Sequence, residues 1–199
     1  MRIDRAVNYV TTLGPGRRLC IWVNGCSRGC KGCVSPNLQR VDESTEVDIF
    51  EYFFRYNLEA IDGVTISGGE PFEQASELWL LVSYLKQRGV RDILIYTGYT
   101  YEELKAKRDP DVEAIFTEIS VLIDGPYVKE LDFGTNNIKG SENQKIHYLD
   151  PSVRHKYTDY IKSERSVCEM TLGSTCLGIG IPDEKYITDF YRSNKKSDS

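Results

Sequence analysis

The chain has 199 residues, 40% of them hydrophobic and 28% charged, with a formal net charge of −5. These values are ordinary for a soluble globular protein, and the length allows one domain with a real core over residues 1–199. The acidic balance disfavours a nucleic-acid binder, which normally carries a basic face.

The chain shows neither the apolar N-terminal run of a signal peptide nor a stretch long enough to span a bilayer, and this favours a cytosolic protein. "MRIDRAVNYVTT" contains no continuous apolar run, so we expect no signal peptide. No stretch reaches the length needed to span a bilayer. We therefore expect a cytoplasmic protein without membrane or nucleic-acid partners, in a compartment where thiols stay reduced.

The first elements alternate between strand and helix. "LCIWV" (Leu19–Val23) is a compact apolar run and predicts a buried strand. Residues 44–57 predict a helix, capped by Ser44 or Thr45, because apolar residues recur there at helical spacing. "GVTISGG" (63–69) predicts a second buried strand that ends in a glycine turn.

The alternation continues in the middle of the chain. Residues 73–89 give the clearest helix, with one apolar face and Gly89 as its C-terminal stop. "DILIYTG" (92–98) predicts a third strand. Thr100 and Glu103 form a capping box for the helix that follows.

Another helix, a fourth strand and a different C-terminal pattern complete the prediction. Asp109 and Pro110 begin a helix, and "ISVLIDGPY" (119–127) predicts a strand. The strand–helix alternation implies an α/β fold with a mainly parallel sheet, whose carboxyl edge collects the loops that carry chemistry. Residues 165–182 look like a β-hairpin, and residues 183–194 look like a final helix.

Three of the six cysteines lie in the loop after the first predicted strand, in "NGCSRGCKGC". Cys26, Cys30 and Cys33 have the spacing C-x3-C-x2-C, and thiolates suit zinc or iron–sulfur clusters. Zinc usually needs four ligands, and only His147 or His155 offers an imidazole. An iron–sulfur cluster with three protein ligands needs no fourth residue if a substrate takes that position. For the remaining cysteines (Cys20, Cys168 and Cys176) we expect small buried hydrophobic residues.

A second motif, "SGGEP", follows the next strand at the same sheet edge. Alone, the segment Gly68–Pro71 is a normal tight turn. Beside a cluster, however, its backbone oxygens and the Glu70 carboxylate offer acceptors for the ammonium group of a bound amino acid. The two motifs on successive strands therefore strengthen the iron–sulfur interpretation over zinc.

Together these motifs resemble the radical S-adenosylmethionine (SAM) superfamily. "LGPGRRLCIWVNGCSRGCKGC", "GVTISGGEPF", "ILIYTGYTYEEL", "VLIDGPY" and "KGSENQK" follow one another as in the activating enzymes of anaerobic ribonucleotide reductase. The likeness covers about residues 10–148, which would be the core, and leaves a C-terminal extension of about 150–199. Lys145 replaces the arginine that ends the family's Gly-Ser-x-Asn-Gln-Arg motif. Gly32 stands where many other radical SAM enzymes carry an aromatic residue, and in this the chain resembles the ribonucleotide reductase activators.

The resemblance implies a partial (β/α) barrel of radical SAM type, with the C-terminal hairpin and helix added. It implies a [4Fe–4S] cluster held by Cys26, Cys30 and Cys33 that reductively cleaves SAM to a 5′-deoxyadenosyl radical. The radical would then create a glycyl radical on a partner, the anaerobic ribonucleotide reductase. A flavodoxin or ferredoxin is the implied electron donor, and no catalytic residue is expected beyond the cluster and SAM.

The same resemblance assigns the contacts to SAM. Glu70 and the backbone of Gly68 and Gly69, with Pro71 completing the motif, would receive the ammonium group. Thr97 and Asp124, at the ends of the next strands, are expected to contact the ribose or the methionine part. Asn143 and Gln144 either line the cleft or fix a loop.

Two other functions stay open at this stage. A radical SAM enzyme that modifies a peptide or small molecule would use the same cluster chemistry with another hydrogen donor. A non-enzymatic zinc or iron–sulfur module would bind no SAM.

Overall fold

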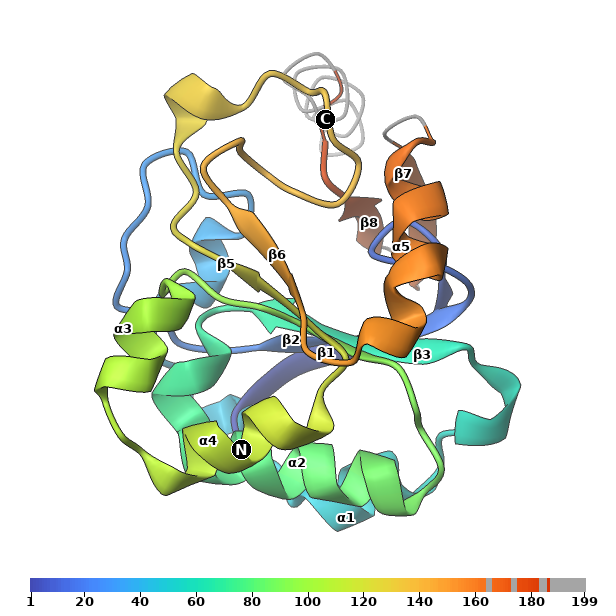
Figure 1. The fold of residues 1–199 in the computed structure, drawn as a ribbon. Coiled ribbons are helices and arrows are strands. Elements are labelled where there is room, and N and C mark those ends of the chain that lie inside the picture. The colour runs from blue at the N-terminus through green and yellow to red at the C-terminus, as the bar shows by residue number, and fades with distance from the viewer. Residues whose placement is uncertain (164–165, 173–174, 183–185, 187–199) are drawn as a thin grey trace, which may run out of the picture.

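The computed structural model describes residues 1–163, 166–172, 175–182 and 186. Its centre is a six-stranded sheet in which the strands lie in chain order (Figure 1). The strands are β1 (Ile3–Val10), β2 (Arg18–Val23), β3 (Gly63–Gly68), β4 (Ile93–Tyr96), β5 (Val121–Asp124) and β6 (Lys145–Tyr148). Strands β2 to β5 are parallel, whereas β1 and β6 are antiparallel at the two edges. The predicted α/β class with a mainly parallel sheet is confirmed.

Five helices accompany the sheet in the described part of the chain: α1 (Ile49–Phe54), α2 (Ala75–Gln87), α3 (Tyr101–Ala106), α4 (Pro110–Glu118) and α5 (Arg154–Ile161). Helices α1, α2 and α4 lie together on one side of the sheet, and α5 lies on the other (Figure 1). The sheet is therefore covered on both faces, as parallel sheets require.

Alternate residues along the central strands pack into two different hydrophobic cores. Ile93, Ile95 and Leu122 belong to the large cluster on the helix side. Leu94 and Ile123 instead pack in a cluster with Tyr157 of α5. Because successive side chains of a strand point to opposite faces, both faces of these central strands are apolar. This explains why they appear in the sequence as continuous apolar runs rather than as alternating patterns.

The helix signals in the middle of the chain are confirmed. Thr100 and Glu103 form the predicted capping box, in which each side chain binds the backbone of the other residue. Asp109 caps α4, with Pro110 at its first helical position. Gly89 follows the end of α2 with a φ of 87°, the left-handed backbone that terminates helices.

The helix predicted over residues 44–57 is present as α1, but its predicted start and cap were wrong. The α-helix starts only at Ile49, and Asp48 caps it rather than Ser44 or Thr45. The reason is a tertiary contact: Glu46 forms a β-bridge with Arg2, and the N–H of Val47 donates to the carbonyl of Met1. These bonds to the N-terminal strand keep the backbone extended just where the helix was expected.

The C-terminal part contains the predicted hairpin. Strands β7 (Val167–Leu172) and β8 (Thr175–Gly180) pair antiparallel. The predicted helix over 183–194 falls on residues outside those the structure describes, as do the side chains of Cys168 and Cys176. Cys20 is buried, as expected. Within the described part of the chain, no helix is long and apolar enough to cross a membrane.

A buried polar network fixes α5 to the sheet. Arg18 on β2 is fully buried and pairs with Asp92, with 3.1 Å between Nη1 and Oδ2. The hydroxyl of Tyr157 donates to the other oxygen of Asp92 at 2.8 Å. A buried ion pair stabilises a fold only when its remaining hydrogen-bonding capacity is used. Tyr157, on helix α5, supplies one of the hydrogen bonds that the buried Asp92 carboxylate needs.

Replacing Tyr157 with phenylalanine should lower the free energy of unfolding by about 1.5–3 kcal/mol, the usual contribution of a hydrogen bond to a charged group. The matched control is Tyr160→Phe, which removes a longer bond of 3.1 Å from a hydroxyl to the carbonyl of Thr11. It should lose less than about 1 kcal/mol. Urea unfolding followed by circular dichroism measures both, and an equal loss in the two variants would contradict the network.

Candidate functional site

The three clustered cysteines lie on a loop that leaves the carboxyl end of β2. The loop turns at Gly25, Gly29 and Gly32, whose φ values of 97°, 59° and 77° belong to the left-handed region that favours glycine. Its start is pinned by backbone bonds, because Gly25 and Cys26 donate to the carbonyls of Leu38 and Gln39. The glycines thus allow a short segment to curve around one space.

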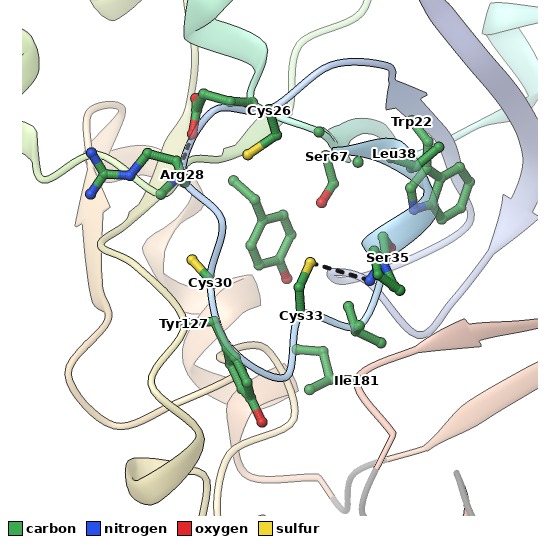
Figure 2. Close-up of a pocket in the computed structure, with 18 of the residues that line it drawn as sticks. Trp22, Cys26, Arg28, Cys30, Cys33, Ser35, Leu38, Ser67, Tyr127 and Ile181 are labelled. Atoms are coloured by element: carbon green, nitrogen blue, oxygen red, sulfur yellow. Dashed lines mark hydrogen bonds between the residues drawn. The ribbon is translucent and has the colours of Figure 1, made fainter. Parts of the chain in front are cut away.

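The cysteine side chains face that space together. Figure 2 shows the sulfur atoms of Cys26, Cys30 and Cys33 pointing toward one cavity from three sides. The Sγ of Cys33 accepts a hydrogen bond from the N–H of Ser35 at 3.4 Å. Burial raises the pKa of the Cys26 thiol. Three soft thiol ligands around one cavity are a donor set that fits an iron–sulfur cluster.

The Gly68–Gly69 pair lies directly against this loop. The N–H of Gly69 donates to the carbonyl of Val23, and the N–H of Glu70 donates to the carbonyl of Gly25. A Cβ on Gly69 would lie 2.2 Å from the Gly25 carbonyl oxygen, which no side chain can tolerate. The two glycines are therefore needed for packing, in addition to any ligand contact, because they let "SGGEP" dock against the start of the cysteine loop.

Glu70 is buried at the centre of a hydrogen-bond network. Its side chain is 1% exposed, and it accepts bonds from the Thr97 hydroxyl at 2.8 Å and the Gly98 N–H at 2.7 Å. The N–H of Phe72 is a third donor, at 3.0 Å. Burial raises the pKa of this carboxyl, against the effect of the three donors. The network joins the end of β3 to the end of β4.

A cavity of about 570 Å³ opens between these elements. Its walls include the cysteine loop, residues 67–70, Tyr96 to Gly98, Gly125 and residues 178–182 of the C-terminal segment. This volume is within the usual range for small-molecule sites, about 300–1,000 Å³. The structure therefore brings Cys26, Cys30, Cys33, Gly68, Gly69, Glu70 and Thr97 to one cavity, at the carboxyl edge of the parallel strands.

Two of the predicted ligand contacts do not line the cavity. Pro71 begins a 3-10 turn (Pro71–Gln74) behind it. Asp124 accepts hydrogen bonds from the N–H of Tyr101 at 2.6 Å and of Lys145 at 3.1 Å. It thus links β5 to α3 and β6, and its neighbour Gly125 is the residue that reaches the cavity. The sequence predicted the correct turn but not the direction of the side chain.

The open question about Asn143 and Gln144 is answered by their contacts. Asn143 Nδ2 donates to the carbonyl of Pro126, and Gln144 Nε2 donates to the carbonyl of Gly125. Gln144 Oε1 also accepts from the N–H of Gly140. Both side chains fix the loop after β5, and Gln144 in addition lines the cavity.

Neither histidine that a zinc site would recruit lines the cavity. His147 lies on β6, stacks on Tyr101 at 4.8 Å and has its Nε2 atom 3.0 Å from Asp124. His155 is exposed on α5. In the part of the chain that the structure describes, no group of three His, Cys, Asp or Glu side chains forms a site for a single metal ion.

Several cavity residues were not predicted from the sequence. They include Trp22, Arg28, Tyr96, Tyr127 and Ile181. Arg28 lies between the first two cysteines, with its guanidinium 4.6 Å from the ring centre of Tyr99. Its place inside the cysteine motif and the position of Tyr96 at a strand end are signals that sequence reasoning could have used. Nothing local in the sequence connects Ile181 to the cysteine loop.

Comparison with known proteins gives consistent matches. Residues 12–147 match a family model described as a 4Fe-4S single cluster domain. The anaerobic ribonucleoside-triphosphate reductase-activating protein of phage T4 is 31% identical over 153 residues, which cover 73% of this chain and 93% of the phage protein. The protein of the same name from Escherichia coli K12 is 30% identical over 145 residues (68% and 91%). That from Haemophilus influenzae is 32% identical over 142 residues (67% and 89%).

Proposed function

The chain belongs to the family of anaerobic ribonucleoside-triphosphate reductase-activating proteins, and its residues 12–147 match a 4Fe-4S single cluster domain; we therefore propose that it activates such a reductase. In this proposal the chain would hold a [4Fe–4S] cluster and SAM, which together would supply the reductive chemistry, through a 5′-deoxyadenosyl radical, that creates a glycyl radical on the reductase. The observation that carries the proposal is that the three cysteines and Gly68–Glu70 line one cavity.

Cys26, Cys30 and Cys33 would hold the cluster. Three cysteines are one ligand fewer than a four-cysteine cluster site has, and SAM would take the remaining position. The glycines of the loop allow backbone N–H groups to approach the cluster, and such hydrogen bonds tune its potential. This protein would therefore contribute ligands, potential and exclusion of water, while the cofactors supply the redox chemistry.

The SAM ammonium group would be received by Gly68, Gly69 and Glu70. The Glu70 carboxylate is already oriented by Thr97 and Gly98, so it needs no rearrangement to accept a further donor. Thr97 lines the same cavity and orients Glu70. Asp124 and Pro71 would support the turns from behind, since their side chains do not reach the cavity.

The fold supports this assignment at the level of architecture. We interpret the six strands in chain order as a partial barrel of radical SAM type, open at β1 and β6. Residues 1–199 would form one radical SAM domain, with a core of about 10–148 and an extension from about 150. An open side suits a protein substrate, because the partner itself can complete the enclosure that a reactive radical needs. The protein would work in the cytoplasm, with a flavodoxin or ferredoxin as donor.

One anaerobic experiment tests the cofactor chemistry. The purified chain is reconstituted with iron and sulfide, reduced with dithionite and supplied with SAM, and 5′-deoxyadenosine is measured by chromatography. We expect its formation to require both cluster and reductant. A chain with a full cluster that cleaves no SAM would instead be a binding or electron-transfer module. SAM cleavage without radical formation on the reductase would favour a radical SAM enzyme with a peptide or small-molecule substrate.

A further inference from the structure

The C-terminal hairpin forms one wall of the cavity. Residues 178–182, at the end of β8 and just beyond it, line the same cavity as the three cysteines. Figure 2 shows Ile181 on the Cys33 side of this space. The family model ends at residue 147, before α5 and the hairpin. The wall is thus built by a part of the chain that lies outside the matched domain.

This wall is fixed firmly to the domain. Ile179 is buried in a cluster with Val7, Val10 and Cys20 of β1 and β2. Its carbonyl accepts a hydrogen bond of 2.8 Å from the buried hydroxyl of Thr12, which is 167 residues away in the chain. Residues 180–182 therefore continue from an anchored strand rather than from a free tail.

The backbone at Gly180 shows how closely this anchor packs. Gly180 has a φ of 148°, and a Cβ there would lie 2.6 Å from the carbonyl oxygen of Ser166 and 3.4 Å from Thr12. Glycine thus allows β8 to pass close to the start of β7 and to the loop after β1. The contact fixes where Ile181 and Pro182 enter the cavity wall.

The two sides of the cavity differ in chemistry. On the side of β3 and β4 lie the acceptors proposed for SAM: Gly68, Gly69, Glu70 and Thr97. The side formed by β1, β2, the loop between them and the hairpin is mainly apolar, with Leu13, Trp22, Ile179 and Ile181, and with Arg5 as a charged residue. Among the residues named for the second side, only Arg5 and the indole N–H of Trp22 offer side-chain hydrogen bonds, so this side has few partners for the ribose hydroxyls or for the ammonium group of SAM.

Part of the apolar lining of the cavity is also exposed. Val34, directly after Cys33, is 63% exposed and lines the cavity. Ile181 and Pro182 of the hairpin wall are half-buried. Exposed apolar groups at the rim of a site are typical of a surface that a partner protein covers.

We infer that the hairpin wall, with Ile181 at its centre, recognises the partner: it contacts the polypeptide segment of the reductase that carries the target glycine. This inference rests on the proposed function. The hairpin would select which polypeptide reaches the cluster, while the β3–β4 side holds SAM. Ile181 is thus a specificity residue and takes no part in SAM cleavage.

The test compares Ile181→Asp with Phe54→Asp, a matched change at an apolar residue of α1 that is 79% exposed and does not line the cavity. The first measurement is the dissociation constant of the cluster-free chain for purified anaerobic ribonucleoside-triphosphate reductase. Ile181→Asp should weaken binding about tenfold or more, as for a central interface residue, and Phe54→Asp should not. Ile181→Ala, which adds no buried charge, should weaken binding in the same direction if the aspartate variant does not fold.

The second measurement is SAM cleavage by the reconstituted variants in the absence of reductase. We expect Ile181→Ala to cleave SAM at the rate of the unchanged chain. Unaltered reductase binding in both Ile181 variants would overturn the inference, as would a parallel loss of SAM cleavage, which would assign the wall to the cofactor. If the unchanged chain cleaves no SAM, the proposed function fails, while the binding data still decide whether the hairpin contacts the reductase.

Discussion

Replacing Cys30 with alanine should abolish cluster binding and SAM cleavage together. Cys30 is the middle residue of the three whose sulfurs face the cavity, and two cysteines cannot replace the lost ligand. Loss of an outer-shell partner costs about 10–100-fold in metal affinity, and loss of a direct ligand should cost more. Iron and sulfide content and the visible absorption of the reconstituted protein measure the cluster, and 5′-deoxyadenosine measures the chemistry.

The chain offers a matched control in Cys20. Cys20 lies on β2 and is 1% exposed, and burial raises the pKa of its thiol to about 12, so it is poorly suited to be a ligand. Cys20→Ala should keep the cluster and SAM cleavage, with a modest loss of stability from the cavity that it leaves. SAM cleavage that survives in Cys30→Ala would show that the ligands are assigned wrongly.

The second large effect is expected at Gly69. Gly69→Ala would place a methyl group 2.2 Å from the Gly25 carbonyl oxygen, so the cysteine loop and the β3 turn must move apart. Overpacking of this kind typically costs about 1–3 kcal/mol of stability, and contact with rigid backbone should bring the loss to the upper end. Because the displaced segment carries Cys26, cluster occupancy should fall as well.

Gly89→Ala separates this clash from simple backbone strain. Gly89 has a φ of 87°, but nothing lies within 4 Å of a Cβ built on it. The Gly89→Ala variant should lose only the stability that a left-handed alanine costs, about 1–2 kcal/mol, and should keep full cluster occupancy. Thermal unfolding and iron content of both variants test the difference. If Gly69→Ala retains a full cluster and loses no more stability than Gly89→Ala, the close approach of the two motifs is not needed.

The central strands were predictable because burial on both faces makes them continuous apolar runs. The edge strands were not: β1 has half-buried and exposed residues among its buried ones, and β6 has no fully buried residue. Such strands carry polar residues that local patterns assign to loops. Their pairing with β2 and β5 depends on the tertiary fold, which no short window of sequence contains.

The candidate site was predictable where the chain order fixes it. The cysteine motif and "SGGEP" follow adjacent parallel strands, so topology alone brings them to one edge. The direction of a side chain at a strand end is a different matter: Asp124 binds backbone N–H groups of α3 and β6, while Gly125 faces the cavity. The hairpin wall depends on the contact between Thr12 and Ile179, far apart in the chain, and could not be foreseen.

Radical formation on the partner is the most direct test of the proposed activity. The reconstituted, reduced chain is mixed with SAM and anaerobic ribonucleoside-triphosphate reductase without oxygen, and the sample is frozen for electron paramagnetic resonance spectroscopy. The proposal predicts a glycyl radical signal on the reductase that is absent without SAM and absent with the Cys30→Ala chain. A chain with a full cluster that cleaves SAM yet gives no such signal on the reductase would contradict it.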